Sequence, residues 1–203
     1  MVDNARVRVG HCCPDAPTVD IHVDGDPAFT DIAYKDTTDY AEIEAGRRHI
    51  EVVPTGESEP VIDASFSFDE ETEHTALATG LLSEAELTVL TDDPGRIPSD
   101  QAELRCVHAA PDAPSVDIRA AGGSMIAENL AFRSASEYEQ LDAGEYTIEI
   151  MPAGSNEVVL EVDGITLSDQ TAYSALAVGQ MADDSLEALM LEDAQQMVPA
   201  DDD

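Results

Sequence analysis

The 203-residue sequence has no tryptophan, four phenylalanines, three cysteines and a single lysine. Its nine basic residues stand against 44 Asp and Glu, which gives a net charge of −35. A chain with so few cations cannot neutralise phosphate groups, so nucleic acid and anionic membranes are excluded as partners. No apolar run approaches 18 residues, so we expect no membrane insertion.

The low cysteine count excludes a disulfide scaffold, because Cys12, Cys13 and Cys106 allow at most one intramolecular bridge. None of them lies in a C-x-x-C pair. We interpret them as small buried thiols that stand in for alanine. A bridge to Cys106 and a redox or metal role are the alternatives.

Sequence patterns of known enzymes are also missing. There is no G-x-S-x-G elbow, no H-E-x-x-H, no phosphate loop and no Rossmann glycine pattern. We therefore predict that the protein is not an enzyme and that it uses no cofactor.

The acidic excess is itself informative. Self-repulsion at this charge destabilises a compact state at low salt, yet a hydrophobic content of 43% argues against a disordered acidic chain. In molar salt the Debye length shrinks to about 3 Å and the repulsion is screened. The composition resembles that of proteins from extremely halophilic archaea, which implies high salt and hydrated cations around the protein.

A long internal repeat organises the chain. The segment from His11 to Ile21 returns from His108 to Ile118, 97 residues later, and a repeat of that length is a domain-sized unit. Matching positions continue to the end of both copies. The predicted divisions are repeat one at 4–92, a proline-containing linker at 93–101, repeat two at 102–192 and a solvated acidic tail at 193–203.

Within each repeat the hydrophobic period is two. Residues 19–24 and 64–69 alternate apolar and polar side chains, and turn residues recur every 8 to 12 positions. This pattern predicts an antiparallel β-sandwich of about seven strands. The predicted fold class is therefore all-β, with two tandem antiparallel β-sandwich (Ig-like) domains.

The repeated Pro-Asp-Ala-Pro segment predicts a rigid corner between the first two strands, because both prolines fix φ and lack an N–H donor. Asp15 and Asp112 are suited to accept hydrogen bonds from amides of the nearby turn. His11 and His108 end the preceding strand, where an imidazole could brace the corner. The alternative is a ligand or metal site built from the histidine and aspartate of a corner, His11 with Asp15 or His108 with Asp112, because His with carboxylate is acceptable zinc chemistry.

A second candidate metal site lies in repeat one. Asp20, Asp24 and Asp26 surround a glycine turn and suggest calcium, which binds several carboxylate oxygens. Repeat two does not share this pattern, and an acidic chain brings aspartates together by chance. The remaining histidines do not recur as histidine and are predicted to lie at the surface: His22, His49 and His74.

The motif H-x-x-P-D-A-P-x-V-D-I, followed by an Ala-Gly turn and then by I-E-hydrophobic-hydrophobic-P-x-G, resembles the domain of unknown function 4397 family over both repeats. The resemblance implies an Ig-like β-sandwich and a role at the cell surface, and it carries over no catalytic residues. Family members usually have small residues where this chain has Cys12 and Cys13.

Three hypotheses for the function follow. The preferred one is a non-enzymatic binding module of a halophile, associated with the cell envelope, with a protein or a surface polymer as partner. The second is a hydrolase or metal-dependent enzyme that uses the His-x-x-Pro-Asp-Ala-Pro corner. The third is a self-associating structural protein. We expect an extracellular location if a leader has been removed, and a cytoplasmic one otherwise.

Overall fold

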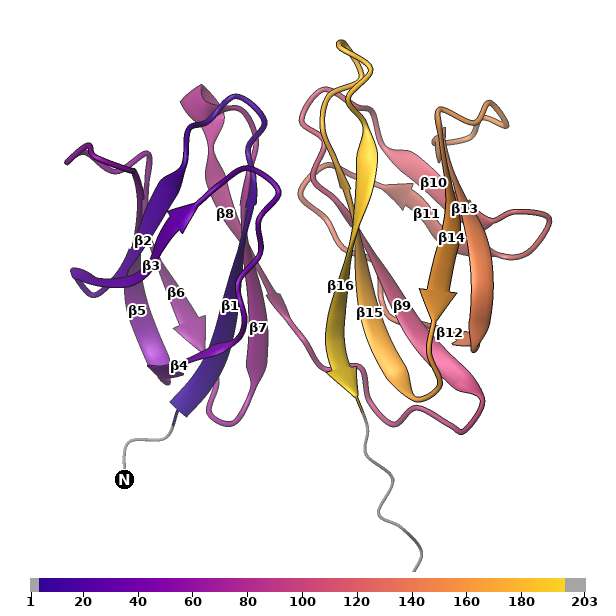
Figure 1. Cartoon of the computed structure of the whole chain (residues 1–203), viewed down its shortest axis with the longest axis horizontal. Coiled ribbons are helices and arrows are strands. Elements are labelled where there is room, and N and C mark those ends of the chain that lie inside the picture. The colour runs from indigo at the N-terminus through magenta and orange to yellow at the C-terminus, as the bar shows by residue number, and fades with distance from the viewer. Residues whose placement is uncertain (1–3, 196–203) are drawn as a thin grey trace, which may run out of the picture. The chain divides into compact units, whose positions relative to one another are not determined.

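The computed structural model describes residues 4–195 and is all-β (Figure 1). The chain divides into two compact units, and each repeat forms its own sandwich, which confirms the predicted fold class. Within the described range, the one helical element is the 3-10 turn η1 (Leu82–Glu84), and no helix is long and apolar enough to cross a membrane.

Each repeat contains eight strands, one more than the turn spacing predicts. Repeat one consists of β1 (Asn4–Cys12), β2 (Val19–Val23), β3 (Asp26–Ile32), β4 (Ala41–Glu44), β5 (Gly46–Pro54), β6 (Ile62–Phe68), β7 (Glu73–Thr79) and β8 (Glu86–Thr91). Repeat two consists of β9 (Gln101–His108), β10 (Val116–Ala120), β11 (Met125–Leu130), β12 (Glu139–Asp142), β13 (Gly144–Pro152), β14 (Leu160–Leu167), β15 (Thr171–Val178) and β16 (Glu187–Gln195).

The two repeats share one topology. In repeat one the sheets have the orders β4-β1-β7-β8 and β3-β2-β5-β6, and in repeat two β12-β9-β15-β16 and β11-β10-β13-β14. Neighbouring strands run antiparallel except for one pair in each repeat: β1 pairs with β7, and β9 with β15, in parallel. The first strand of each repeat therefore pairs with a strand about 67 residues further along the chain.

Alternation decides which side chains enter the cores. In β2, Val19 and Ile21 are buried between the sheets, whereas Asp20 lies on the other face, as the period of a strand requires. The two cores are built mainly from Ala, Val, Ile and Leu. Phe68 is the one phenylalanine that is fully buried among the described residues.

The cysteines confirm the interpretation of small buried thiols. All three are free and at most 2% exposed. Burial raises the pKa of Cys12 and of Cys106 to about 12, so both thiols stay protonated and unreactive at neutral pH.

Two predicted boundaries shift. Strand β16 runs to Gln195 and buries Asp193, so the first residues assigned to the acidic tail at 193–203 belong to the last strand. The rest of that tail lies outside the described residues. Strand β9 begins at Gln101, which was assigned to the linker. Both boundaries were missed because the residues at these strand ends are polar and do not continue the apolar alternation that identifies a strand in the sequence.

Candidate functional site

The repeated His-x-x-Pro-Asp-Ala-Pro segment is a corner between two strands in each repeat. His11 is 1% exposed, with Nε2 3.0 Å from the carbonyl oxygen of Pro17 and Nδ1 3.2 Å from the amide nitrogen of Cys13. Because a carbonyl can only accept and an amide N–H can only donate, the imidazole is neutral and carries its proton on Nε2. His108 Nε2 lies likewise 3.0 Å from the carbonyl oxygen of Pro114. Each imidazole thus braces its own corner.

The aspartates of the corner serve a different contact from the one predicted. Asp15 accepts a hydrogen bond from the amide of Leu82 at 2.7 Å, and Asp112 accepts from the amides of Met181 and Ala182, both at 2.8 Å. These amides belong to the loop after β7 or β15, not to the nearby turn, so the prediction of local turn amides was wrong. The carboxylate fastens the corner to that loop, while the histidine faces the proline carbonyl.

Burial lowers the pKa of His11 and of His108, and the hydrogen bond to the proline carbonyl opposes this shift only in part. The surface position predicted for His74 is wrong, since this residue is 3% exposed and packs edge-on against Phe68 with 5.2 Å between ring centroids. Repeat two has the buried Tyr173 there, so the position requires a ring inside the sandwich. Burial lowers the pKa of His74 as well.

These three histidines predict that acid destabilises the fold. Below the unfolded-state pKa of about 6.5 the unfolded chain binds protons that the native imidazoles refuse, so stability falls as the pH falls. Each histidine adds a slope of up to about 1.4 kcal/mol per pH unit. Denaturant unfolding in molar KCl between pH 5.5 and 7.5 measures it. The double variant His11→Gln/His108→Gln should flatten the slope; a slope equal to that of the wild type would contradict the prediction.

The three calcium candidates are not brought together, because Asp20 lies near the start of β2 whereas Asp24 and Asp26 lie beyond its other end. Asp20 accepts from the amide of Asp31 at 2.8 Å, and Asp24 accepts from the amide of His49 at 2.9 Å. The amide of His49 and the guanidinium of Arg48 hold the pKa of Asp24 below its ordinary value. Asp26 is exposed at the start of β3. Within residues 4–195 no three His, Cys, Asp or Glu side chains are placed to hold a metal ion.

A buried polar cluster recurs in both repeats and was missed in the sequence. In repeat two, Arg105 Nε lies 3.0 Å from Ser174 Oγ, and the hydroxyls of Ser174 and Tyr138 donate to Asp193 at 2.7 and 2.8 Å. The guanidinium also lies over the Tyr138 ring, 4.7 Å from its centroid. Repeat one has the same arrangement of side chains from Arg8, Tyr40, Thr75 and Asp92. Because all its polar groups contact one another, the cluster supports the fold rather than a ligand.

An open groove of about 470 Å³ lies in repeat two. It runs between β11, the edge strand of one sheet, and the segment leading into β12, the edge strand of the other. Its lining contains no aromatic and no basic residue: Met125, Ile126, Ala127, Glu128, Asn129, Leu130, Ala131, Ser134, Ala135, Ser136, Glu137 and Glu139.

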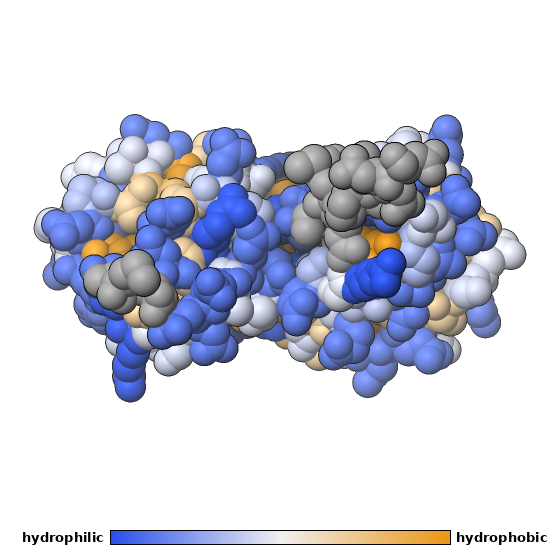
Figure 2. All heavy atoms as spheres, turned by 90° about the horizontal axis from the view of Figure 1, so that it is seen from below, coloured by the Kyte–Doolittle hydropathy of each residue, from blue (hydrophilic) through white to orange (hydrophobic). Residues whose placement is uncertain are grey.

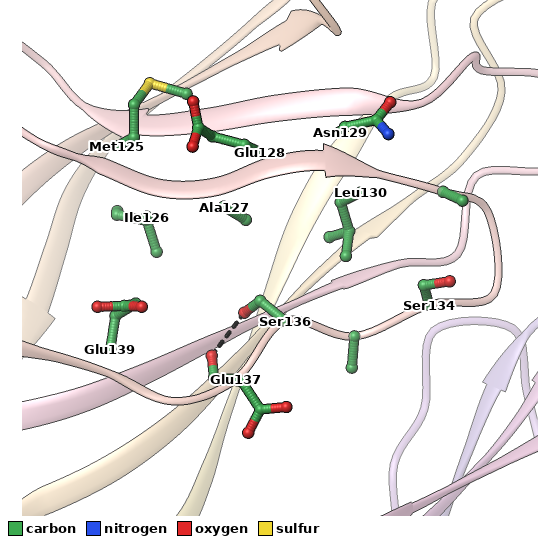
Figure 3. Close-up of a pocket in the computed structure, with 12 residues that line it drawn as sticks. Met125, Ile126, Ala127, Glu128, Asn129, Leu130, Ser134, Ser136, Glu137 and Glu139 are labelled. Carbon is green, nitrogen blue, oxygen red and sulfur yellow. Dashed lines mark hydrogen bonds between the residues drawn. The ribbon is translucent and has the colours of Figure 1, made fainter.

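The two walls of this groove differ in chemistry. Ile126, Ala127 and Leu130 point from β11 toward the segment that carries Ser136 and Glu139 (Figure 3). The hydroxyl of Ser136 donates to the Glu137 carbonyl at 2.7 Å and accepts from the amide of Cys106 at 3.0 Å, so it fixes the wall. Glu139 brings a carboxylate opposite the apolar wall. The groove can therefore hold a slender ligand that is apolar along its length and polar at one end.

Comparisons with known proteins identify a family but no function. A family model described as a domain of unknown function (DUF4397) matches residues 5–119 and 120–203. Among curated proteins, none matches the sequence. A solved candidate cell adhesion protein from Parabacteroides distasonis ATCC 8503 is 9% identical, with a TM-score of 0.28 and coverage of 97% of this chain and 100% of that one.

A second solved structure is a family 26 carbohydrate-binding module from Eubacterium rectale Amy13K, in complex with maltoheptaose. It is 10% identical, with a TM-score of 0.29 and coverage of 97% of this chain and 98% of that one. Neither likeness bears on the function of this chain, because both TM-scores are low.

Proposed function

The chain belongs to the DUF4397 family, and we propose that it is a non-enzymatic binding module that works in concentrated salt at a cell surface. Its partner is a protein or a surface polymer, bound in the groove of repeat two. The observation that carries this proposal is the groove itself, a space of about 470 Å³ beside buried apolar side chains, lined by residues of an edge strand from each sheet. That volume lies within the range of ligand sites in proteins.

The state of the repeated corner supports a binding role over catalysis. A general base needs an imidazole nitrogen within reach of substrate. In the corner, His11 Nδ1 already accepts the Cys13 amide and Nε2 faces the Pro17 carbonyl, and the ring is buried. The hydrolase alternative would have to break both contacts before His11 could act.

The surface supports a partner met in concentrated salt. The face in Figure 2 is dominated by hydrophilic residues, with small separate hydrophobic areas. Several of the nine basic side chains pair with carboxylates of the same repeat at its surface, as Arg6 does with Glu73, Arg48 with Asp24 and Arg119 with Glu149. The remaining carboxylates make the chain an unfavourable partner for polyanions, which leaves neutral polymers and proteins.

An array of peptides and neutral glycans, probed with labelled protein in 2 M KCl, tests the proposal. We expect binding to a subset of spots that is lost in Ala127→Phe, because the phenyl ring would occupy the groove. Ser155→Ala, in the loop after β13, leaves the groove intact and serves as the control.

Two results would overturn the proposed function. One is an array pattern that is the same for Ala127→Phe and the wild type. The other is turnover of nitrophenyl esters, glycosides or phosphoesters that disappears in His11→Ala/His108→Ala, since it would make the corner an active site.

A further inference from the structure

The two repeats differ at the position that opens the groove. In repeat one Ile21 of β2 pairs with Phe29 of β3, and in repeat two the matching Ile118 of β10 pairs with Ala127 of β11. The Phe29 ring packs against the core of its own repeat. Repeat two has a methyl group at the paired position, while Ile126 beside it enters the core, and both residues line the groove.

A second difference faces the first across the groove. Val7 of β1 pairs with Ala41 of β4, and the matching Leu104 of β9 pairs with Glu139 of β12. Residues two apart in a strand share a face, and Leu141 packs against the core of repeat two. Glu139 therefore lies on the inward face of β12, where repeat one has a methyl group.

Together these differences give repeat two a groove with a carboxylate beside it, where repeat one has Phe29 and Ala41. Ile126, Ala127 and Leu130 form the apolar wall, and Glu139 points toward it (Figure 3). Glu139 is exposed, as many carboxylates of an acidic chain are. Its pairing with the core residue Leu104 nevertheless places it on the inward face of an edge strand.

We propose that this groove binds a lysine side chain presented by an extended segment of a partner protein. The inference rests on the proposed binding function and names its ligand. The four-carbon stem lies along Ile126, Ala127 and Leu130, and the ammonium group reaches the Glu139 carboxylate. Lysine commonly buries its stem on apolar surface while its charged head remains polar.

The lining selects lysine among the charged side chains. It has no aromatic ring for a guanidinium to stack on, which is a favoured contact of arginine. The Glu139 carboxylate, which points toward the apolar wall, repels anions. Because molar salt screens charges beyond about 3 Å, only a direct contact pair and apolar burial retain their strength there, and a lysine side chain supplies both.

Titration by NMR in 2 M KCl tests the proposal with short peptides of glycine and serine around one central residue. We expect the lysine peptide to shift groove amides with an affinity about tenfold above that of the Nε-acetyl-lysine peptide. Glu139→Gln should lower the lysine affinity about tenfold, and Ala127→Phe should abolish the shifts. Glu157→Gln, an exposed carboxylate in the loop after β13 and outside the groove lining, is the matched control and should change the affinity less than twofold.

A second variant tests the proposal by a gain of binding rather than by a loss of binding. Phe29→Ala/Ala41→Glu copies the groove into repeat one and should create a second set of shifts there. If Ala127→Phe fails to fold, Ala127→Leu narrows the same space and should weaken binding at least fivefold.

Three outcomes would overturn the lysine assignment. Equal binding of the lysine and acetyl-lysine peptides, sensitive to Ala127→Phe, would do so while leaving the proposed groove function intact. Binding of n-butylammonium as tight as that of the peptide would show that the groove takes a small cation rather than a partner protein.

The third outcome concerns a different role for Glu139, because inward-pointing charges also discourage pairing between the edge strands of two molecules. Self-association of Glu139→Gln in light scattering, with unchanged peptide affinity, would give Glu139 that role instead.

Discussion

The folded chain is expected to unfold when KCl falls well below molar. With 44 acidic and nine basic residues, repulsion among carboxylates opposes every compact state. At 0.1 M ionic strength the Debye length is about 10 Å, which spans neighbouring carboxylates, whereas at 1 M it is about 3 Å. Natural domains hold only about 5–15 kcal/mol of stability, so this repulsion decides between folded and unfolded.

Circular dichroism between 3 M and 0.05 M KCl measures this transition, and the loss of strand signal should be reversible when salt is restored. Sucrose at matched osmolality is the control, because it favours burial through exclusion from the surface but does not screen charge. Equal melting temperatures in dilute and molar KCl would contradict the expectation and, with it, the halophilic part of the proposed function.

The sandwich and its corners follow from the sequence because their causes are local. Strand alternation and turn residues act within a few positions, and the prolines of the corner restrict their own backbone wherever the rest of the chain lies. The same alternation and the same corner occur in both copies, so the pattern is not a chance one. Even the bracing of His11 follows, because the proline carbonyl is only six residues away.

The contacts that escaped prediction join residues far apart. Arg8 stands opposite Thr75, and Arg105 opposite Ser174, only because the first strand of each repeat pairs in parallel with a distant strand. Asp15 likewise meets an amide 67 residues away. Hydrophobic periodicity does not determine which strands become neighbours, so these long-range contacts could not be predicted from the sequence.

The groove was missed for another reason. Its determinants, Ala127 and Glu139, are positions where the two copies differ, whereas motif searching favours positions where they agree. Strand register makes the comparison with Phe29 and Ala41 possible. The residues that both repeats share thus maintain the fold, whereas Ala127 and Glu139, which differ from their counterparts in repeat one, form part of the groove of repeat two.

Arg105→Met is expected to cost about 3–5 kcal/mol of stability, because it leaves the Asp193 carboxylate buried without its cation. Arg105 and Asp193 are each 4% exposed, and the guanidinium nitrogen Nη2 lies 3.7 Å from the carboxylate oxygen. The hydroxyls of Ser174 and Tyr138 also donate to that oxygen. They cannot replace a full positive charge that is lost from a buried site.

Denaturant unfolding in molar KCl measures the loss, with Arg119→Met as the matched control. Arg119 pairs with Glu149 at 2.5 Å, and the two side chains are 32% and 14% exposed, so water reaches the remaining carboxylate and the cost should stay well below that of Arg105→Met. The double variant Arg105→Met/Asp193→Leu should recover most of the lost stability, since it removes both buried charges together. If Arg105→Met costs no more than Arg119→Met, the cluster does not depend on its charge pair, and its recurrence in both repeats has another cause.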